Sequence, residues 1–192
     1  MTEDQMTEDQ KFYRTVRFSQ TTITELMIPS YANFGGKIHG GILLSLMDKA
    51  AYACASKHSS GYCVTVSVDT VDFLQPIEVG ELVALIASVH YVGNSSMMIG
   101  IKVISENVHT STVRHTNTSY FTMVSKDETD QIKKVPGLFL ETKEEVKNFI
   151  DAMKRKEIKD YYKKELKKLF DIPESEEHDI EILKDERCLI VH

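Results

Sequence analysis

The sequence predicts an α+β domain in which one long buried helix packs against an antiparallel sheet. Residues 40–58 form an almost wholly apolar helical segment without proline. Four segments that alternate apolar and polar residues follow, joined mostly by short turns, and strands joined in this way run antiparallel. The chain of 192 residues, 42% of them hydrophobic, is long enough for one stable core and an appendage.

The residues before the helix predict a strand and then a loop. Residues 11–26 have alternating, β-branched character, which is typical of a strand. Residues 28–38 contain Pro29 and a Gly-Gly pair, which indicate a loop. Residues 1–10 are MTEDQ written twice, and we expect a disordered start there.

The segments after the helix predict most of the sheet. The predicted strands cover residues 64–73, 81–92, 97–104 and 115–124, with a turn at Gly93-Asn94. Together with the strand expected ahead of the helix, they predict a sheet of five to six strands.

The composition changes after Pro136-Gly137. Residues 142–170 are rich in Glu and Lys and carry apolar residues at roughly helical spacing, with Thr142 as the expected N-cap. The lysines alternate with acidic residues, which indicates a solvated amphipathic helix. The expected organisation is a start (1–10), a domain (11–136), a helical extension (137–170) and an acidic tail (171–192).

Composition excludes several classes of protein. A formal net charge of -6 argues against non-specific binding of nucleic acid. The three cysteines form no C-x-x-C pair and the histidines show no metal spacing, so we expect no metal site and no cofactor. Cys54 and Cys63 lie in apolar surroundings and are expected to be core thiols. No apolar run has membrane-spanning length and the acidic start is unlike a signal peptide, so we expect a cytoplasmic protein.

The candidate site lies where the loop enters the helix. Asp48 stands in the apolar segment, where desolvation would disfavour its charge, so we expect it either to be well hydrogen-bonded or to take part in chemistry. The alternative is a structural aspartate that accepts from a backbone amide or pairs with Lys49. Gly40 and Gly41 place free N–H groups and the positive end of the helix dipole where an oxyanion could bind, or they serve only close packing. Asn33, taken alone, is typical of a turn.

An ordered set of motifs resembles one family. The set is Asn33, His39-Gly40-Gly41, Asp48, Val68-Asp69-x-Val71-x-Phe73-x-x-Pro76-Ile77, Gly80-Glu81, Tyr91-x-Gly93-x-Ser95-Ser96-Met97, Phe121-x-Met123-Val124 and Val135-Pro136. Each motif alone is common, but their order is similar to that of the acyl-CoA thioester hydrolase branch of the hotdog superfamily. The resemblance covers roughly Phe12 to Glu145.

The resemblance implies an activity and an assembly. The activity is hydrolysis of fatty acyl-CoA thioesters to free acid and CoA, without a covalent nucleophile. The assembly is a homodimer whose sheets join edge to edge, commonly within a trimer of dimers, with the active site at the dimer interface. Asn33 of one subunit would then face Asp48 of the partner subunit. Asp48 would activate water, Gly41 with Gly40 would bind the oxyanion, and Asn33 would orient the water or the carbonyl.

Further residues are expected to bind substrate. His39 either caps the helix or lines the pocket. In the family the turn with Ser95 and Ser96 approaches CoA, although a plain hairpin turn explains these serines equally well. The basic candidates for the CoA phosphates, with solvated surface charge as the alternative, are Lys57, His58 and Arg114.

Two other functions fit the same fold. One is a non-catalytic acyl-CoA sensor, which would bind its ligand without hydrolysis. The other is a dehydratase, which usually pairs a histidine with a carboxylate; here the partner of Asp48 is Asn33, which disfavours it. A serine hydrolase is disfavoured because G-x-S-x-G is absent.

Overall fold

The computed structural model describes residues 12–170 and 187–188. The expected disordered start and the acidic tail, apart from residues 187–188, lie outside the described residues. The elements in chain order are β1 (Tyr13–Thr15), α1 (Val16–Ser19), β2 (Thr21–Leu26), η3 (Pro29–Tyr31), α2 (Gly40–Ser59), β3 (Tyr62–Val68), β4 (Leu82–Val92), β5 (Ser96–Asn107), β6 (Thr112–Lys126), β7 (Gly137–Phe139) and α3 (Lys143–Phe170).

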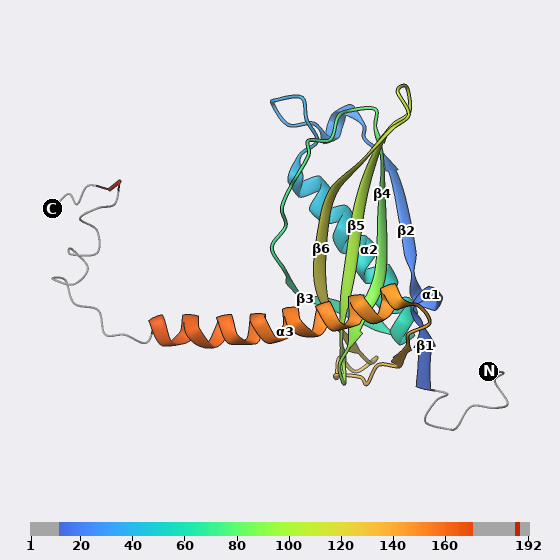
Figure 1. Cartoon of the computed structure of the whole chain (residues 1–192), viewed down its shortest axis with the longest axis vertical. Coiled ribbons are helices and arrows are strands. Elements are labelled where there is room, and N and C mark those ends of the chain that lie inside the picture. Colours follow the sequence, from blue (N-terminus) through green and yellow to red (C-terminus); the bar gives the residue numbers. More distant parts are fainter. Residues whose placement is uncertain (1–11, 171–186, 189–192) are drawn as a thin grey trace. The chain divides into compact units, whose positions relative to one another are not determined.

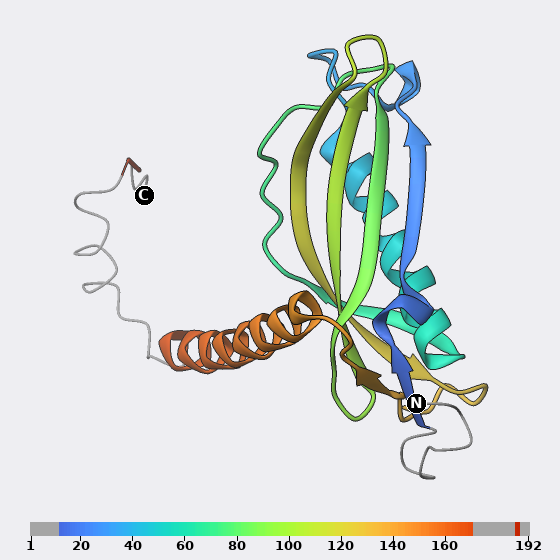
Figure 2. The ribbon, with the colours of Figure 1, turned by 45° about the vertical axis from the view of Figure 1, so that its right-hand side comes forward.

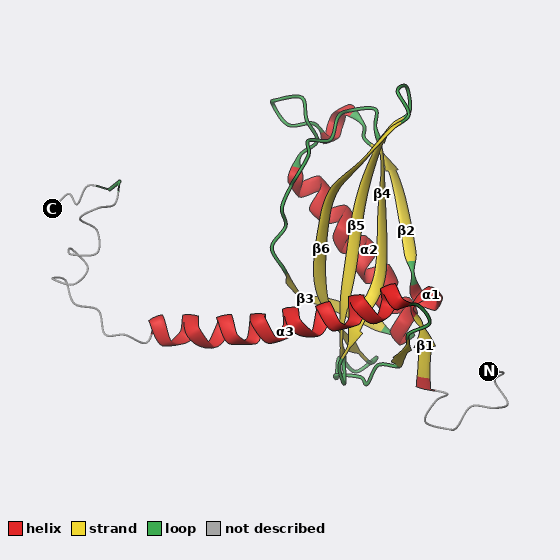
Figure 3. Ribbon diagram, in the orientation of Figure 1, coloured by secondary structure: helices red, strands yellow, loops and turns green. Residues whose placement is uncertain are grey.

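A five-stranded antiparallel sheet curls around α2. The strand order is β2-β4-β5-β6-β3, so β2 and β3 are the edges. Figures 1 and 2 show α2 lying along one side of this sheet, and Figure 3 separates the two kinds of element by colour. The predicted hotdog fold is confirmed.

Alternation along the strands explains the core. Every second residue of β4, from Val83 to Val89, is buried against α2, as are alternate residues of β5. The face of α2 that meets them is formed by Leu43, Leu46, Met47, Ala50, Ala51, Cys54 and Ala55. Burial raises the pKa of Cys54 to about 12, and Cys63 is buried as well, which confirms that both are core thiols.

The prediction that α2 is buried on every side is wrong. The sheet covers one face, and the opposite face exposes Leu44, Ser45, Asp48, Lys49 and Tyr52. Asp48 is therefore an exposed carboxylate in the single chain, and this chain does not supply the desolvation expected for it. A helix that packs against a single sheet keeps a second side free for another surface.

The predicted strand at residues 11–26 is interrupted. A single helical turn, α1, separates β1 from β2, and only β2 joins the main sheet. The short β1 instead pairs in parallel with β7, matching Tyr13 to Gly137. The extension expected to be helical from residue 137 thus begins with a strand.

Other strands also begin or end at residues that differ from the predicted ones. β3 ends at Val68 rather than at residue 73, and the following segment lies along β6 through single hydrogen bonds such as Asp69 N–H to the Tyr120 carbonyl (2.9 Å). β5 and β6 form a longer hairpin than alternation alone indicated, with 12 and 15 residues. Their pairing makes them the central ladder of the sheet.

The cap predicted for the C-terminal helix is confirmed. The Glu145 N–H donates to Thr142 Oγ1 (3.1 Å), and the Thr142 N–H donates to Glu145 Oε2 (2.9 Å), which is a capping box. Contacts divide the chain into two compact units within α3, after Ala152. The domain boundary expected at residue 136 stays a prediction. None of the described helices is long and apolar enough to cross a membrane.

A buried histidine fastens the end of α2. His58 Nε2 lies 3.0 Å from the Pro136 carbonyl oxygen and Nδ1 lies 3.3 Å from Ser19 Oγ. Because a carbonyl only accepts, Nε2 carries the proton and Nδ1 accepts from the hydroxyl. Burial lowers the pKa of His58, opposed by the Pro136 hydrogen bond. The prediction that His58 binds a CoA phosphate is therefore wrong, because the ring is fully buried and both nitrogens are used.

We predict that His58 makes stability depend on pH. Its pKa is lower when folded than the ordinary 6.5, so stability is full above that value and falls as the pH is lowered through it, because the unfolded chain binds the proton more readily. Urea unfolding at a series of pH values measures this. His58→Gln keeps a donor and an acceptor but does not titrate, so its stability should fall less in acid.

The control variant is His109→Gln, which changes an exposed histidine in the β5–β6 turn. Its unfolding free energy should fall with pH as in the unchanged protein. Equal slopes for His58→Gln and the unchanged protein would contradict the prediction.

Candidate functional site

His39 caps the N-terminus of α2. Its Nδ1 accepts from the Gly41 N–H at 3.0 Å, so the capping alternative is observed. A Cβ on Gly40 would lie 3.2 Å from the Phe73 ring, so glycine lets this ring approach the helix closely. The first turn of α2 is thus contacted by two side chains: His39 accepts from its backbone, and the Phe73 ring packs against Gly40.

This cap corrects the expected oxyanion site. The Gly41 N–H was expected to be free, but it is held by His39 in this structure. The N–H of Gly40, at the first helical position, is one of the groups that a helix cannot satisfy internally. Gly41 can donate to a substrate only if the exposed His39 ring first turns away.

Asn33 holds its own loop together. Its Oδ1 accepts from the N–H groups of Gly35 (2.9 Å) and Lys37 (3.2 Å), and its own N–H donates to the Lys37 carbonyl (2.7 Å). Two backbone donors on one atom identify that atom as the oxygen. The turn interpretation is thus correct, and the exposed Nδ2 is the atom left to contact a substrate.

Asp48 has a partner that sequence reasoning missed. Thr65 Oγ1, on β3, donates to Asp48 Oδ1 at 2.6 Å. The β3–β6 register shifts between Thr65 and Ser67, and such bulges re-aim side chains. Thr65 stands in an ordinary strand alternation, so no signal in the sequence singles it out.

Asp48 and Thr65 line one cavity of about 410 Å³. Its seven lining residues all lie on α2 or in the first half of β3: Asp48, Lys49, Tyr52, Tyr62, Cys63, Val64 and Thr65. Asn33 and the Gly40-Gly41 pair are not among them. Asp48 lies eight residues after Gly40, which is about 12 Å along a helix. Within one chain the predicted site residues therefore form two groups.

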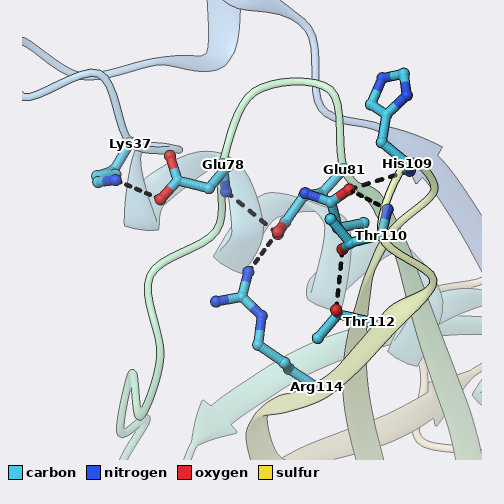
Figure 4. Close-up of polar contacts among 8 residues, drawn as sticks. Lys37, Glu78, Glu81, His109, Thr110, Thr112 and Arg114 are labelled. Carbon is cyan, nitrogen blue, oxygen red and sulfur yellow. Dashed lines mark hydrogen bonds and ion pairs between the residues drawn. The ribbon is translucent and has the colours of Figure 1, made fainter.

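A polar network supports the Asn33 loop (Figure 4). Lys37 forms an ion pair with Glu78, whose N–H donates to Glu81 Oε2 at 3.3 Å. The buried Glu81 carboxylate forms an ion pair with Arg114 on β6. The Arg114 guanidinium thus neutralises a buried carboxylate, and its contact with a CoA phosphate stays a prediction.

Three other predicted residues keep structural contacts. Lys57 Nζ donates to the Gln20 carbonyl at 3.1 Å. Ser95 lies in the β4–β5 turn and Ser96 begins β5; their carbonyls accept from the N–H groups of Ser125 (3.0 Å) and Gly93 (2.8 Å). Contact of Lys57 or these serines with CoA stays a prediction. Among the described residues no cluster of His, Cys, Asp and Glu could hold a metal ion.

Comparison with known sequences decides the family. Residues 35–112 match the thioesterase superfamily. The chain is 44% identical over 134 residues to protein VdlD of Helicobacter pylori, covering 70% of this chain and 76% of that protein. It is 34% identical over 142 residues to YkhA of Bacillus subtilis, named an uncharacterized acyl-CoA thioester hydrolase, covering 74% of this chain and 83% of that one. The chain belongs to the acyl-CoA thioester hydrolase family.

Other members of this family extend the comparison. The human cytosolic acyl coenzyme A thioester hydrolase is 32% identical over 143 residues, which are 73% of this chain and 38% of that protein. A hexameric acyl-CoA thioesterase superposes with a TM-score of 0.76 at 35% identity, covering 78% of this chain and 96% of that one. The acyl-CoA hydrolase of Staphylococcus aureus, solved with butyryl-CoA and CoA, gives 0.76 at 29% identity, covering 82% and 96%.

We predict that the Glu81–Arg114 pair contributes much more to stability than the Lys37–Glu78 pair. Arg114→Met leaves a buried carboxylate without its cation, which should lower the free energy of unfolding by about 3 kcal/mol. Lys37→Met removes one cation from an exposed pair and should cost less than about 1 kcal/mol. Urea unfolding at neutral pH measures both, and equal costs would contradict the prediction.

Proposed function

We propose that this protein hydrolyses fatty acyl-CoA thioesters to free fatty acid and CoA. The observation that carries the proposal is the Asp48–Thr65 pair, 2.6 Å apart, beside a cavity of a chain that belongs to this family. Water attacks the thioester carbonyl, its proton passes to Asp48, and the tetrahedral intermediate expels the CoA thiolate, which takes up a proton. The reaction balances with water alone, so we expect no cofactor.

Asp48 and Thr65 have different roles in the proposed mechanism. The Asp48 carboxylate acts as the general base or positions the water. Thr65 occupies Oδ1 with its hydroxyl, which fixes the carboxylate and leaves Oδ2 to accept a proton. Gly40 and Gly41 stabilise the oxyanion in the proposed site, once the His39 ring has left the Gly41 N–H.

Variants of the Staphylococcus aureus hydrolase support these residues. Structures exist of that enzyme with one asparagine, one aspartate or one threonine replaced by alanine. The intervals between those three positions in its sequence equal the intervals between Asn33, Asp48 and Thr65. The same three residue types thus recur at the same spacing in both chains.

We further propose that a second copy of the chain completes the site. Asn33 is absent from the cavity that Asp48 lines, so its amide must come from elsewhere to act there. The edge strand β3 exposes Tyr62, Val66 and Val68 and has one free side for pairing. A dimer, assembled further as in the hexameric relative, would bring Asn33 of one subunit to Asp48 of the partner subunit. Following the cytosolic human relative, we place the reaction in the cytoplasm.

Release of free thiol from a series of acyl-CoAs, followed with a thiol reagent, tests the function. Asp48→Ala should lower kcat by about 10²–10⁴-fold, because the reaction loses its general base. Asp48→Asn keeps the shape and should lose turnover while it still binds CoA. The control is Ser45→Ala, on the same exposed face of α2 but outside the cavity, which should keep the original rate.

Unchanged turnover in Asp48→Ala would refute the mechanism. Tight binding of acyl-CoA by the unchanged protein, with no thiol released, would instead show that the protein is a non-catalytic acyl-CoA sensor.

Mixing two inactive variants tests the shared site. Asn33→Ala and Asp48→Ala are each expected to be nearly inactive. After unfolding and refolding together in equal amounts, half of the dimers are mixed, and each mixed dimer holds one site with both native residues. Thiol release should recover to about a quarter of that of the unchanged protein. If both residues act within one chain, every site keeps one defect and no activity returns.

A further inference from the structure

An aromatic pair stands beside the candidate catalytic carboxylate. Tyr52 lies one helical turn after Asp48 on the exposed face of α2, and Tyr62 lies at the start of β3, three residues before Thr65. The two rings meet edge to face, with centroids 6.3 Å apart and an interplanar angle of 62°. Both tyrosines line the cavity that Asp48 and Thr65 line.

The chemistry of the lining indicates which part of an acyl-CoA lies toward the pair. Beside the rings the cavity is bounded by Cys63 and Val64, and Lys49 is its one cationic lining residue. Burying the charged phosphates of CoA against aromatic rings would cost free energy, because a single lysine replaces only part of the water that they lose. An acyl chain gains free energy when it is buried against the same rings.

We propose that Tyr52 and Tyr62 close one end of the acyl site and set the length of the acyl chain that is hydrolysed. This inference rests on the proposed function. A thioester whose carbonyl lies at Asp48 extends its acyl chain toward the rings. Chains that reach the pair stop against two rigid rings, and longer chains lose binding because their last methylenes stay in water.

The exposure of the pair makes it testable. Tyr52 is 43% and Tyr62 54% exposed, so neither ring is part of the core. Truncation of either one leaves no cavity inside the folded domain and should not prevent folding. An unchanged melting temperature of each variant would verify this.

The experiment is a chain-length profile of kcat/KM, from acetyl-CoA to palmitoyl-CoA. In Tyr52→Ala, and separately in Tyr62→Ala, the optimum should move to longer chains. The ratio of kcat/KM for the chain two methylenes beyond the original optimum to that for the optimum should rise about tenfold. The matched control is Tyr52→Phe, which keeps the ring and should keep the original profile.

The outcomes separate this inference from the proposed function. Hydrolysis with the same profile in both alanine variants would overturn the chain-length role alone. A loss of kcat/KM that is uniform over all chain lengths would also overturn it, because the pair would then serve the shared CoA moiety. If the unchanged protein releases no thiol from any acyl-CoA, the proposed function fails and this inference fails with it.

Discussion

The coverage of α2 by a single sheet is the constraint on which the rest of the structure depends. One face of the helix forms the core with β4 and β5, and the other keeps Asp48 and Tyr52 in solvent. The two faces of α2 therefore have different roles. Substitutions on the inner face change the packing of the core, whereas the outer face can carry polar and aromatic groups without disturbing that packing. The edge strand β3 borders a site on the outer face through Thr65 and Tyr62, but Asp48 and Tyr52 stay exposed in the single chain.

Both ends of the same helix are held by histidines. His39 accepts from the backbone at the start, and His58 joins the last turn to α1 and to Pro136. The first histidine is exposed, whereas the second is fully buried. The last turn of α2 is thus fixed to the core, whereas the partner of the N-terminal amide lies in solvent.

Most of the fold could be predicted from the sequence, but its pairings could not. Alternation located β4, β5 and β6, and apolar composition located α2, because both report local periodicity. Periodicity does not reveal which sides of a helix find a partner, and for that reason Asp48 was expected to be buried. The partners of Asp48, Arg114 and His58 are Thr65, Glu81 and the Pro136 carbonyl, each distant in sequence. Charge alone assigned Arg114 and His58 to a ligand, and it could not reveal that each contacts a buried group of the protein.

The parallel pairing of β1 with β7 determines where the chain can be shortened. The strand at Tyr13 has its backbone partner at Gly137, and the buried His58 has its acceptor at Pro136. A fragment that ends at residue 136 would lack β7, so β1 would lose its backbone partner, and the strand that leads into α3 would be missing. A shortened fragment therefore has to retain both β1 and β7.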